Sequence, residues 1–189
     1  MPALVVIPTY QEAENVADVL ARVRTSVPDA HILVVDDGSP DGTADLAQAK
    51  ADELGQIDVL RRAAKSGLGP SYRAGFAWGL ERGHDVLIEM DADLSHDPAV
   101  LPQLIEAVTT GGADLAIGLD QVRADGYGFQ IEMAYEVSKA GGTIVEIPIE
   151  FRDRLRGESK MSPNIVGEAL WLVTRWGVRD RTRRLRRHR

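Results

Sequence analysis

The sequence predicts an α/β fold in which a mostly parallel sheet is flanked by helices. Short runs rich in β-branched residues alternate along the chain with longer segments of helical periodicity. The short runs are nearly continuously apolar, which is typical of parallel strands that are covered on both faces. A chain of 189 residues with 44% hydrophobic content suffices for one good-sized core and is short for two domains.

The strand signals are apolar runs that end in polar or turn-forming residues. The first four read ALVVIP, HILVVDD, IDVLRR and DVLIEMD, and ADLAIG and TIVEIPIEF follow later in the chain. We therefore expect strands over residues 3–8, 31–37, 57–62, 85–91, 113–118 and 143–151.

Helices are expected between these strands, over residues 14–27, 41–54, 69–83 and 98–112. The first carries apolar residues at helical spacing, and the second has Asp41 or Thr43 near its start. The third is interpreted as a helix despite its glycines. The fourth opens with Pro98 and closes with two glycines, which is the usual asymmetry of helix ends.

The C-terminal part has two interpretations. An apolar stripe at helical spacing favours a core-facing helix, although Trp171 and Trp176 beside a basic segment also suit a helix at a membrane interface. The stripe consists of Ile165, Ala169, Leu172, Val173 and Trp176. The basic segment, residues 179–189, is either a solvated tail or an anchor to an anionic membrane surface. We expect one domain over residues 1–178 and a tail over 179–189.

Composition excludes several classes of protein. The formal net charge of -7 argues against a general nucleic-acid binder, so no nucleic-acid partner is expected. The absence of cysteine excludes a disulfide scaffold and a cysteine-ligated zinc site. No signal peptide and no apolar stretch of membrane-spanning length is recognised.

Conspicuous polar residues follow four of the expected strands: PTYQE, DDGSPDG, KSGLG and DADLSHDP. In a parallel sheet these segments lie along one edge, where ligands bind in such folds. Each segment taken alone is also explained by ordinary turns and helix caps. Their convergence is what predicts a binding site.

Asp91 and Asp93 are the candidate metal ligands. An Asp-X-Asp triplet alone is weak evidence, because it occurs by chance in many proteins. Clustered carboxylates repel one another unless a cation is present, and their hard oxygens suit Mg²⁺ or Mn²⁺. Because Mg²⁺ is usually bound by one or two carboxylates plus substrate phosphates, the pair fits a metal–diphosphate clamp. Neither a G-x-G-x-x-G turn nor a phosphate-binding G-K-[ST] loop is present.

Six segments, in this order, resemble the polyprenyl-phosphate (dolichol-phosphate) mannose synthases: VVIPTYQEAEN, VVDDGSPDGT, KSGLGPSYRAGF, MDADLSHDP, GYGFQIEM and IEFRDRLRGESKMS. The resemblance runs from about Ala3 to Trp176. It implies a family 2 glycosyltransferase with the GT-A fold, a Rossmann-like, mostly parallel sheet flanked by helices. It further implies inverting transfer of mannose from GDP-mannose to a membrane polyprenyl monophosphate. Because the acceptor is a membrane lipid and no spanning segment is recognised, we expect a cytoplasmic protein, peripheral at the cytoplasmic face of the membrane.

The resemblance also implies roles for individual residues. For the guanine nucleotide it implies a pocket of Pro8, Tyr10 and Glu12, with Val35 and Asp37 on base or ribose. For the metal and the sugar diphosphate it implies Asp91, Ala92 and Asp93, and for the phosphates Arg154 and Lys160. Gln130 and Glu132 are implied as sugar-side or supporting residues, with a purely structural role as the alternative.

These roles describe a coherent reaction. The acceptor phosphate is already anionic near neutral pH, so we expect no catalytic base. The metal, Mg²⁺ or Mn²⁺, stabilises the negative charge that grows on the leaving GDP, with help from Arg154 and Lys160.

The sequence departs from the family after Gly118, where several dozen expected residues are missing and LDQVRADGYGF follows at once. The missing part would include a phosphate-contacting arginine and much of the acceptor site. A true deletion and an omitted internal segment both explain the gap. The gap keeps open a non-catalytic nucleotide-sugar-binding protein as an alternative to mannosyl transfer. Within the class of transferases, the nearest alternative is a prenyl-phosphate glucosyltransferase that uses UDP-glucose.

Overall fold

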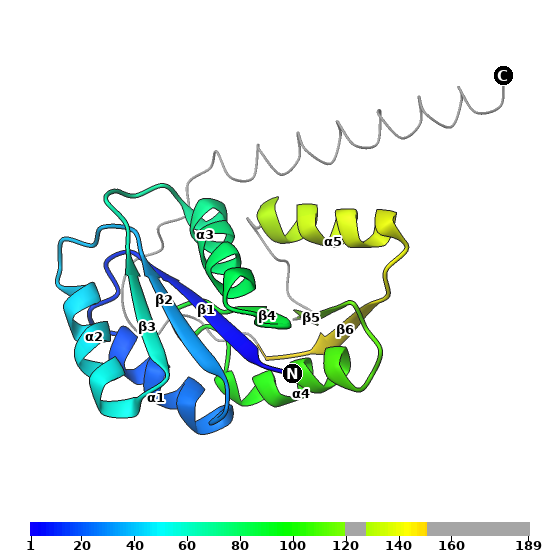
Figure 1. Ribbon diagram of the computed structural model, residues 1–189, viewed down its shortest axis with the longest axis horizontal. Coiled ribbons are helices and arrows are strands. Elements are labelled where there is room, and N and C mark those ends of the chain that lie inside the picture. The colour runs from blue at the N-terminus through cyan, green and yellow to red at the C-terminus, as the bar shows by residue number, and fades with distance from the viewer. Residues whose placement is uncertain (120–127, 151–189) are drawn as a thin grey trace, which may run out of the picture.

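The computed structural model describes residues 1–119 and 128–150 (Figure 1). The predictions for Arg154, Lys160, the C-terminal apolar stripe, the domain boundary at residue 178 and the basic tail lie outside the described residues.

Four parallel strands form the main sheet, in the order β3-β2-β1-β4. They are β1 (Ala3–Thr9), β2 (His31–Asp36), β3 (Ile57–Arg61) and β4 (Val86–Glu89). In the register, Val5 lies opposite Ile32 on one side and Ile88 on the other. The four predicted strands are confirmed, and all four end at the same edge of the sheet.

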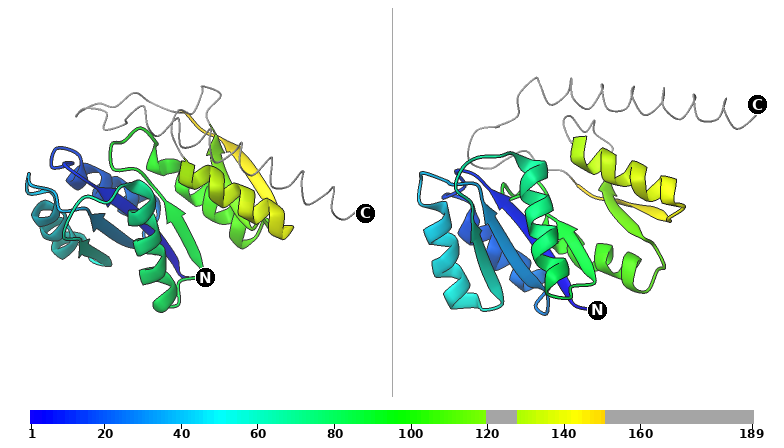
Figure 2. Two further views of the ribbon diagram at one scale, coloured as in Figure 1. Left: turned by 90° about the horizontal axis from the view of Figure 1, so that it is seen from above. Right: turned by 45° about the horizontal axis from the view of Figure 1, so that its top comes forward.

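Helices cover both faces of this sheet (Figures 1 and 2). The helices of one face are α1 (Val16–Ser26), α2 (Thr43–Leu54) and α4 (Leu101–Thr109), whereas α3 (Leu68–Glu81) covers the other. Alternate side chains of a strand point to opposite faces, and accordingly Val5 and Ile7 pack with the first group while Leu4 and Val6 pack beneath α3.

The glycines of α3 let this helix lie close to the sheet. A Cβ on Gly75 would lie 2.4 Å from Val6 Cγ1, and a Cβ on Gly79 would lie 2.6 Å from Leu4 Cδ2. The prediction of a helix despite its glycines is confirmed, and the glycines are explained by this close packing.

The loop after β4 leads through a 3₁₀ turn, η1 (Pro98–Val100), directly into α4. Asp97 caps this turn, because its Oδ1 accepts a hydrogen bond from Ala99 N at 3.0 Å. Pro98 occupies the start of the turn and Gly111 and Gly112 follow α4, as the sequence predicts for this segment.

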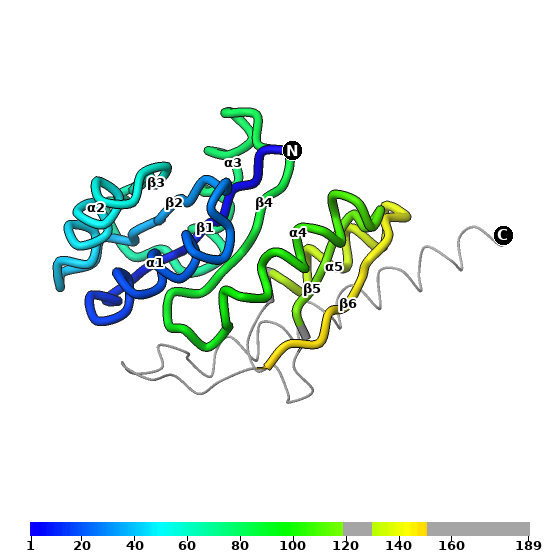
Figure 3. The backbone as a smooth tube through the Cα atoms, turned by 90° about the horizontal axis from the view of Figure 1, so that it is seen from below, coloured from blue at the N-terminus to red at the C-terminus, as the bar shows by residue number. Residues whose placement is uncertain are grey.

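The predicted fifth strand forms, but it does not extend the main sheet. β5 (Leu115–Leu119) pairs in parallel with β6 (Ile144–Pro148) in a separate two-stranded sheet. α5 (Gly128–Ala140) connects the two strands and lies on the same side as α3 (Figures 1 and 3). Among the described residues, no helix is both long enough and apolar enough to cross a membrane.

Candidate active site

The carboxyl ends of β1, β2 and β3 are joined by hydrogen bonds. Thr9 Oγ1, at the end of β1, donates to Asp36 Oδ1 at 3.0 Å, and Asp37 N donates to Thr9 O at 3.0 Å. Arg62 N, just after β3, donates to Asp36 O at 2.8 Å. The polar residues after these strands therefore converge at one edge, as predicted.

Asp37 is buried, with 3% of its surface exposed, and four donors from the protein surround its carboxylate. Oδ1 accepts from Arg62 Nη1 at 2.6 Å and from Ser71 Oγ at 2.9 Å. Oδ2 accepts from the backbone N–H groups of Ser66 and Gly67, at 2.9 and 3.0 Å. Since a carboxylate has about four acceptor positions, Asp37 fixes the loop between β3 and α3. Its predicted contact with base or ribose stays a prediction.

Val35 and Pro8 lie side by side in the register of β2 and β1. The Val35 side chain has 0% exposure and packs beneath α3, whereas Pro8 is half-buried. A ligand contact by the Val35 side chain therefore requires the core to open, and its predicted role at the base is untested. Pro8 lies next to the edge of the sheet, and its role in the nucleotide pocket stays a prediction.

Tyr10 and Glu12 follow β1 at this edge, and both are half-buried. The Lys65 ammonium lies 4.2 Å from the centroid of the Tyr10 ring. Glu12 Oε2 accepts a hydrogen bond from Asn15 Nδ2 at 2.9 Å, and Glu12 N donates to Thr43 Oγ1 at 2.9 Å. The β1 exit is thereby tied to the start of α2.

Asp41 supports the same junction. Its Oδ1 accepts from Thr43 N and Oγ1, and its Oδ2 accepts from Ala13 N. Burial raises the pKa of Asp41, but the hydrogen bonds from Thr43 and Ala13 outweigh it, so the pKa lies below its ordinary value. Both residues named for the start of this helix, Asp41 and Thr43, thus contribute to it.

Asp91, Ala92 and Asp93 follow β4 at the same edge. The Asp91 side chain is 18% exposed; Tyr72 Oη of α3 lies within 3.2 Å of its Oδ1, and His96 Nδ1 lies 3.8 Å from its Oδ2. Asp93 is buried, and its Oδ1 accepts from Ser95 N at 3.0 Å. Ala92 is buried between them.

Leu94 gives this loop an unusual backbone. Its φ of 61° lies in the left-handed region, which a branched side chain rarely adopts, and its side chain is held in the core beneath α1 and α4. Strained residues of this kind concentrate at functional sites, where the surrounding packing holds them in place. Sequence reasoning did not identify Leu94, because nothing in its residue type signals a positive φ.

The chemistry of Asp91 and Asp93 fits a divalent cation that is shared with a diphosphate. In residues 1–119 and 128–150, no three His, Asp or Glu side chains gather closely enough to form a metal cage. A clamp of two carboxylates completed by substrate phosphates needs no third side chain. Tyr72 and the Ser95 N–H each hold one of the two carboxylates, which orients the pair.

Glu89 is a further acidic residue of this region that sequence reasoning missed. Both carboxylate oxygens are buried, and neither has a close hydrogen-bond partner among the described residues. Burial raises the pKa of Glu89 to about 7; the nearby Gln130 amide of α5 acts in the opposite direction, and the charge of Asp91 adds to the rise. A charged residue inside the apolar run VLIEM was the available signal.

The two candidate residues of α5 differ in position. Gln130 is half-buried near Glu89, and its buried Oε1 has no hydrogen-bond partner in the described part of the chain, whereas Glu132 is exposed on the helix surface. Gln130 is thus the one that approaches the carboxyl end of β4.

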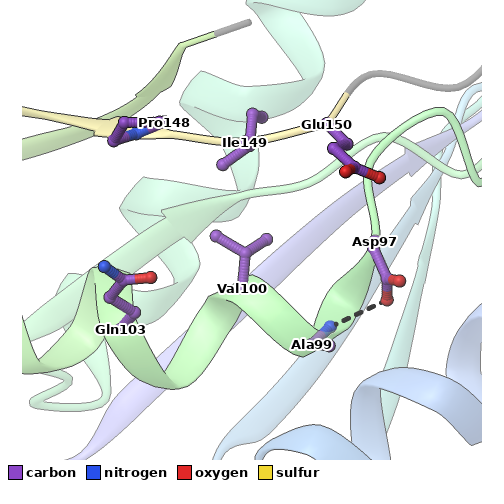
Figure 4. Close-up of a pocket in the computed structure, with 7 residues that line it drawn as sticks. All are labelled: Asp97, Ala99, Val100, Gln103, Pro148, Ile149 and Glu150. Carbon is purple, nitrogen blue, oxygen red and sulfur yellow. Dashed lines mark hydrogen bonds between the residues drawn. The ribbon is translucent and has the colours of Figure 1, made fainter.

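A small groove adjoins the loop after β4 (Figure 4). It has a volume of about 260 Å³ and lies between η1 with α4 on one side and the end of β6 on the other. Its lining includes Asp97, Val100, Gln103, Ile149 and Glu150. Asp97 links this groove to the loop that carries Asp91 and Asp93.

A curated relative and two solved structures resemble this chain. Undecaprenyl-phosphate mannosyltransferase of Micrococcus luteus is 42% identical over 240 residues, covering 98% of both chains. Glucosyl-3-phosphoglycerate synthase of Mycobacterium tuberculosis, in complex with Mn²⁺, UDP-glucose and phosphoglyceric acid, has a TM-score of 0.67 at 17% identity, covering 84% of this chain and 73% of the other. Mannosyltransferase PcManGT of Pyrobaculum calidifontis, in complex with GDP-Man and Mn²⁺, has a TM-score of 0.54 at 17% identity, covering 63% and 35%.

The Micrococcus luteus protein has internal residues that this chain lacks. The alignment spans 240 residues, whereas this chain has only 189, and 98% of both is covered. Several dozen positions of the relative therefore have no counterpart here, which agrees in size with the gap predicted after Gly118. The place of the gap stays a prediction.

A family model described as Glycosyl transferase family 2 matches residues 4–162. This range runs from the second residue of β1 past the end of β6 and contains the Asp91–Asp93 loop. The solved structures show that the arrangement of strands and helices is the GT-A fold of such enzymes. The chain belongs to glycosyltransferase family 2.

Proposed function

We propose that this protein transfers mannose from GDP-mannose to a polyprenyl monophosphate and forms polyprenyl-phosphate mannose with inversion. The observation that carries this proposal is the 42% identity, over nearly the whole of both chains, to an undecaprenyl-phosphate mannosyltransferase. The aspartates, Asp91 and Asp93, at the carboxyl edge of the sheet supply the chemistry that a nucleotide-sugar donor needs.

Asp91 and Asp93 would hold Mg²⁺ or Mn²⁺ against the donor diphosphate. Bound there, the cation would act as a Lewis acid for the negative charge that grows on the leaving GDP. Tyr72 holds Asp91 and the Ser95 N–H holds Asp93, so both ligands are oriented before the donor arrives. Structures of the same fold that contain Mn²⁺ with a nucleotide sugar support this assignment.

The protein's other groups would bind the donor and orient it. Pro8, Tyr10 and Glu12 lie at the end of β1, where the base of the nucleotide would lie. Arg154 and Lys160 would contact the phosphates. The acceptor phosphate monoester carries its own negative charge, so no residue is assigned as a general base.

The acceptor is a lipid, and we propose that the protein meets it as a peripheral protein at the cytoplasmic face of the membrane. Residues 179–189 contain seven arginines and would be attracted to anionic headgroups by about 1 kcal/mol per basic residue near the surface. In flotation with anionic vesicles, removal of residues 179–189 should reduce binding to the vesicles. Undiminished binding would show that another part of the protein binds the membrane.

The direct test of the proposed function is product formation. Labelled GDP-mannose with polyprenyl phosphate and Mn²⁺ or Mg²⁺ should give polyprenyl-phosphate mannose. UDP-glucose in its place should give no comparable product. Transfer from UDP-glucose alone would favour the prenyl-phosphate glucosyltransferase.

A second candidate is a nucleotide-sugar-binding protein without transferase activity. It is favoured by the several dozen residues of the Micrococcus luteus protein that have no counterpart in this chain. It predicts GDP-mannose binding without product. Intact mass separates the two explanations of the gap: a value of 20.6 kDa supports a true deletion, and a substantially larger one supports an omitted segment.

A further inference from the structure

Lys65 lies on the loop between β3 and α3, and this loop is fixed from two sides. The neighbouring Ser66 and Gly67 donate their backbone N–H groups to Asp37. Gly38, with a φ of +72°, brings the β2 exit so close that a Cβ there would lie 3.3 Å from Arg62 O. The backbone of Lys65 is therefore positioned by the fold.

The Lys65 ammonium lies over Tyr10, 4.2 Å from the ring centroid. Arg62 on the same loop directs its guanidinium to Asp37, whereas Lys65 has no ion-pair partner among the described residues. The attraction of an exposed ammonium to an aromatic ring is weak. Lys65 can therefore exchange Tyr10 for a better acceptor that enters at this edge.

The saturated carboxylate of Asp37 restricts how a guanine base can be recognised. Its four protein donors leave it unable to accept from N1–H and the 2-amino group unless they are displaced. The other edge of guanine carries two acceptors, O6 and N7, whereas adenine replaces O6 with an amino donor. A lysine ammonium has three donors and no acceptor, so it complements guanine and opposes adenine.

We propose that Lys65 is a specificity residue that donates to O6 and N7 of the guanine base of the donor. This inference rests on the proposed function, in which the base lies against Tyr10. It assigns the choice of guanine to the β3–α3 loop and gives the Asp37 network the task of holding that loop in place.

The test is calorimetric binding of four diphosphates to the full chain in the presence of Mn²⁺. GDP and inosine diphosphate share O6 and N7, although inosine lacks the 2-amino group. ADP carries an amino donor in place of O6, and UDP reports on the phosphates with a smaller base. The variants are Lys65→Met, which keeps the length of the side chain without its charge, and Lys50→Met, a control that removes a cation paired with Glu53 on α2.

In the wild type, GDP and inosine diphosphate should bind with similar affinity and more tightly than ADP. Lys65→Met should weaken GDP and inosine diphosphate by about tenfold and leave ADP unchanged. Lys50→Met should bind all four like the wild type. Unchanged melting temperatures would show that both variants fold, as expected because Lys65 is exposed and Lys50 is half-buried on the surface of α2.

Two results would overturn the inference while leaving the proposed function intact. Equal weakening of all four nucleotides would make Lys65 a phosphate contact, and wild-type affinity of Lys65→Met for GDP would remove it from the site. A wild type that binds no guanine nucleotide would instead overturn the proposed donor together with this inference.

Discussion

The main sheet and the β5–β6 sheet differ in how completely they are buried. In β1, all residues from Leu4 to Ile7 are fully buried, and β2 is buried from Ile32 to Asp36. In β6 only Ile147 is buried, and Val145 on the same strand is exposed. A two-stranded sheet is at best marginally stable alone, whereas a four-stranded sheet covered on both faces supports itself. Among the described residues, the part of the molecule around the main sheet is therefore more completely buried than the part around the β5–β6 sheet.

The largest loss of stability is expected around the main sheet, from a substitution that removes the Asp37 carboxylate and its hydrogen bonds. Asp37→Ala would leave Arg62 and two backbone N–H groups without their acceptor and should cost about 3 kcal/mol of unfolding free energy. The matched control is Asp45→Ala, because Asp45 pairs with the adjacent Arg61 in an exposed bridge with side chains 78% and 50% exposed. It should cost less than about 0.5 kcal/mol.

Urea denaturation of both variants measures this difference. Similar losses for Asp37→Ala and Asp45→Ala would contradict the assignment of the Asp37 carboxylate as the group that holds the β3–α3 loop against the end of β2.

A somewhat smaller effect is expected at Glu89, where α5 approaches the end of β4. The raised pKa of about 7 means that the folded state binds more protons than the unfolded state between about pH 4.5 and 7. Stability should therefore fall as pH rises through that range. Glu89→Gln, which stays neutral, should be more stable than wild type at pH 8 by roughly 1–3 kcal/mol, and the gain should vanish near pH 4.

The readout is the difference in unfolding free energy between Glu89→Gln and wild type across this pH range. A difference that does not change with pH would show that Glu89 keeps an ordinary pKa, and that α5 does not shield it from solvent.

How much of this could be predicted from the sequence differs between the two parts as well. The strands and helices of the main sheet, the shared edge and the position of Asp91 and Asp93 follow from periodicity and strand order. The saturation of Asp37 could not be predicted, because it depends on the conformation of a loop that begins 25 residues later in the chain. The burial of Val35 likewise depends on which face α3 covers.

The separate β5–β6 sheet was also beyond prediction from local patterns. ADLAIG has the composition of a buried parallel strand, but strand pairing is a tertiary property that composition does not specify. The positive φ of Leu94 also could not be predicted, because it depends on the packing of this side chain in the core.

The smallest difference in stability is expected between two glycine-to-alanine substitutions, one in α3 against the main sheet and one in the β5–β6 sheet. Gly75→Ala places a Cβ 2.4 Å from Cγ1 of the stiff Val6 side chain, so it should destabilise the protein by about 1–3 kcal/mol. Gly118→Ala on β5 places a Cβ 2.9 Å from Cδ1 and 3.1 Å from Cγ2 of Ile149; because this side chain is only half-buried and can shift, the substitution should cost less than about 1 kcal/mol. Thermal unfolding measures the loss of stability in each variant. An equal loss, or a larger loss for Gly118→Ala, would contradict the tighter packing that we assign to the main sheet.

The most direct test of the account is GDP-mannose binding, with and without Mn²⁺, to wild type and to Asp93→Ala. We predict that Mn²⁺ tightens binding to the wild type at least tenfold and that Asp93→Ala, shown to be folded by a cooperative thermal transition, loses this dependence. Metal-independent binding by the wild type, or full metal dependence in Asp93→Ala, would contradict the role of this carboxylate as a ligand of a diphosphate-bound cation.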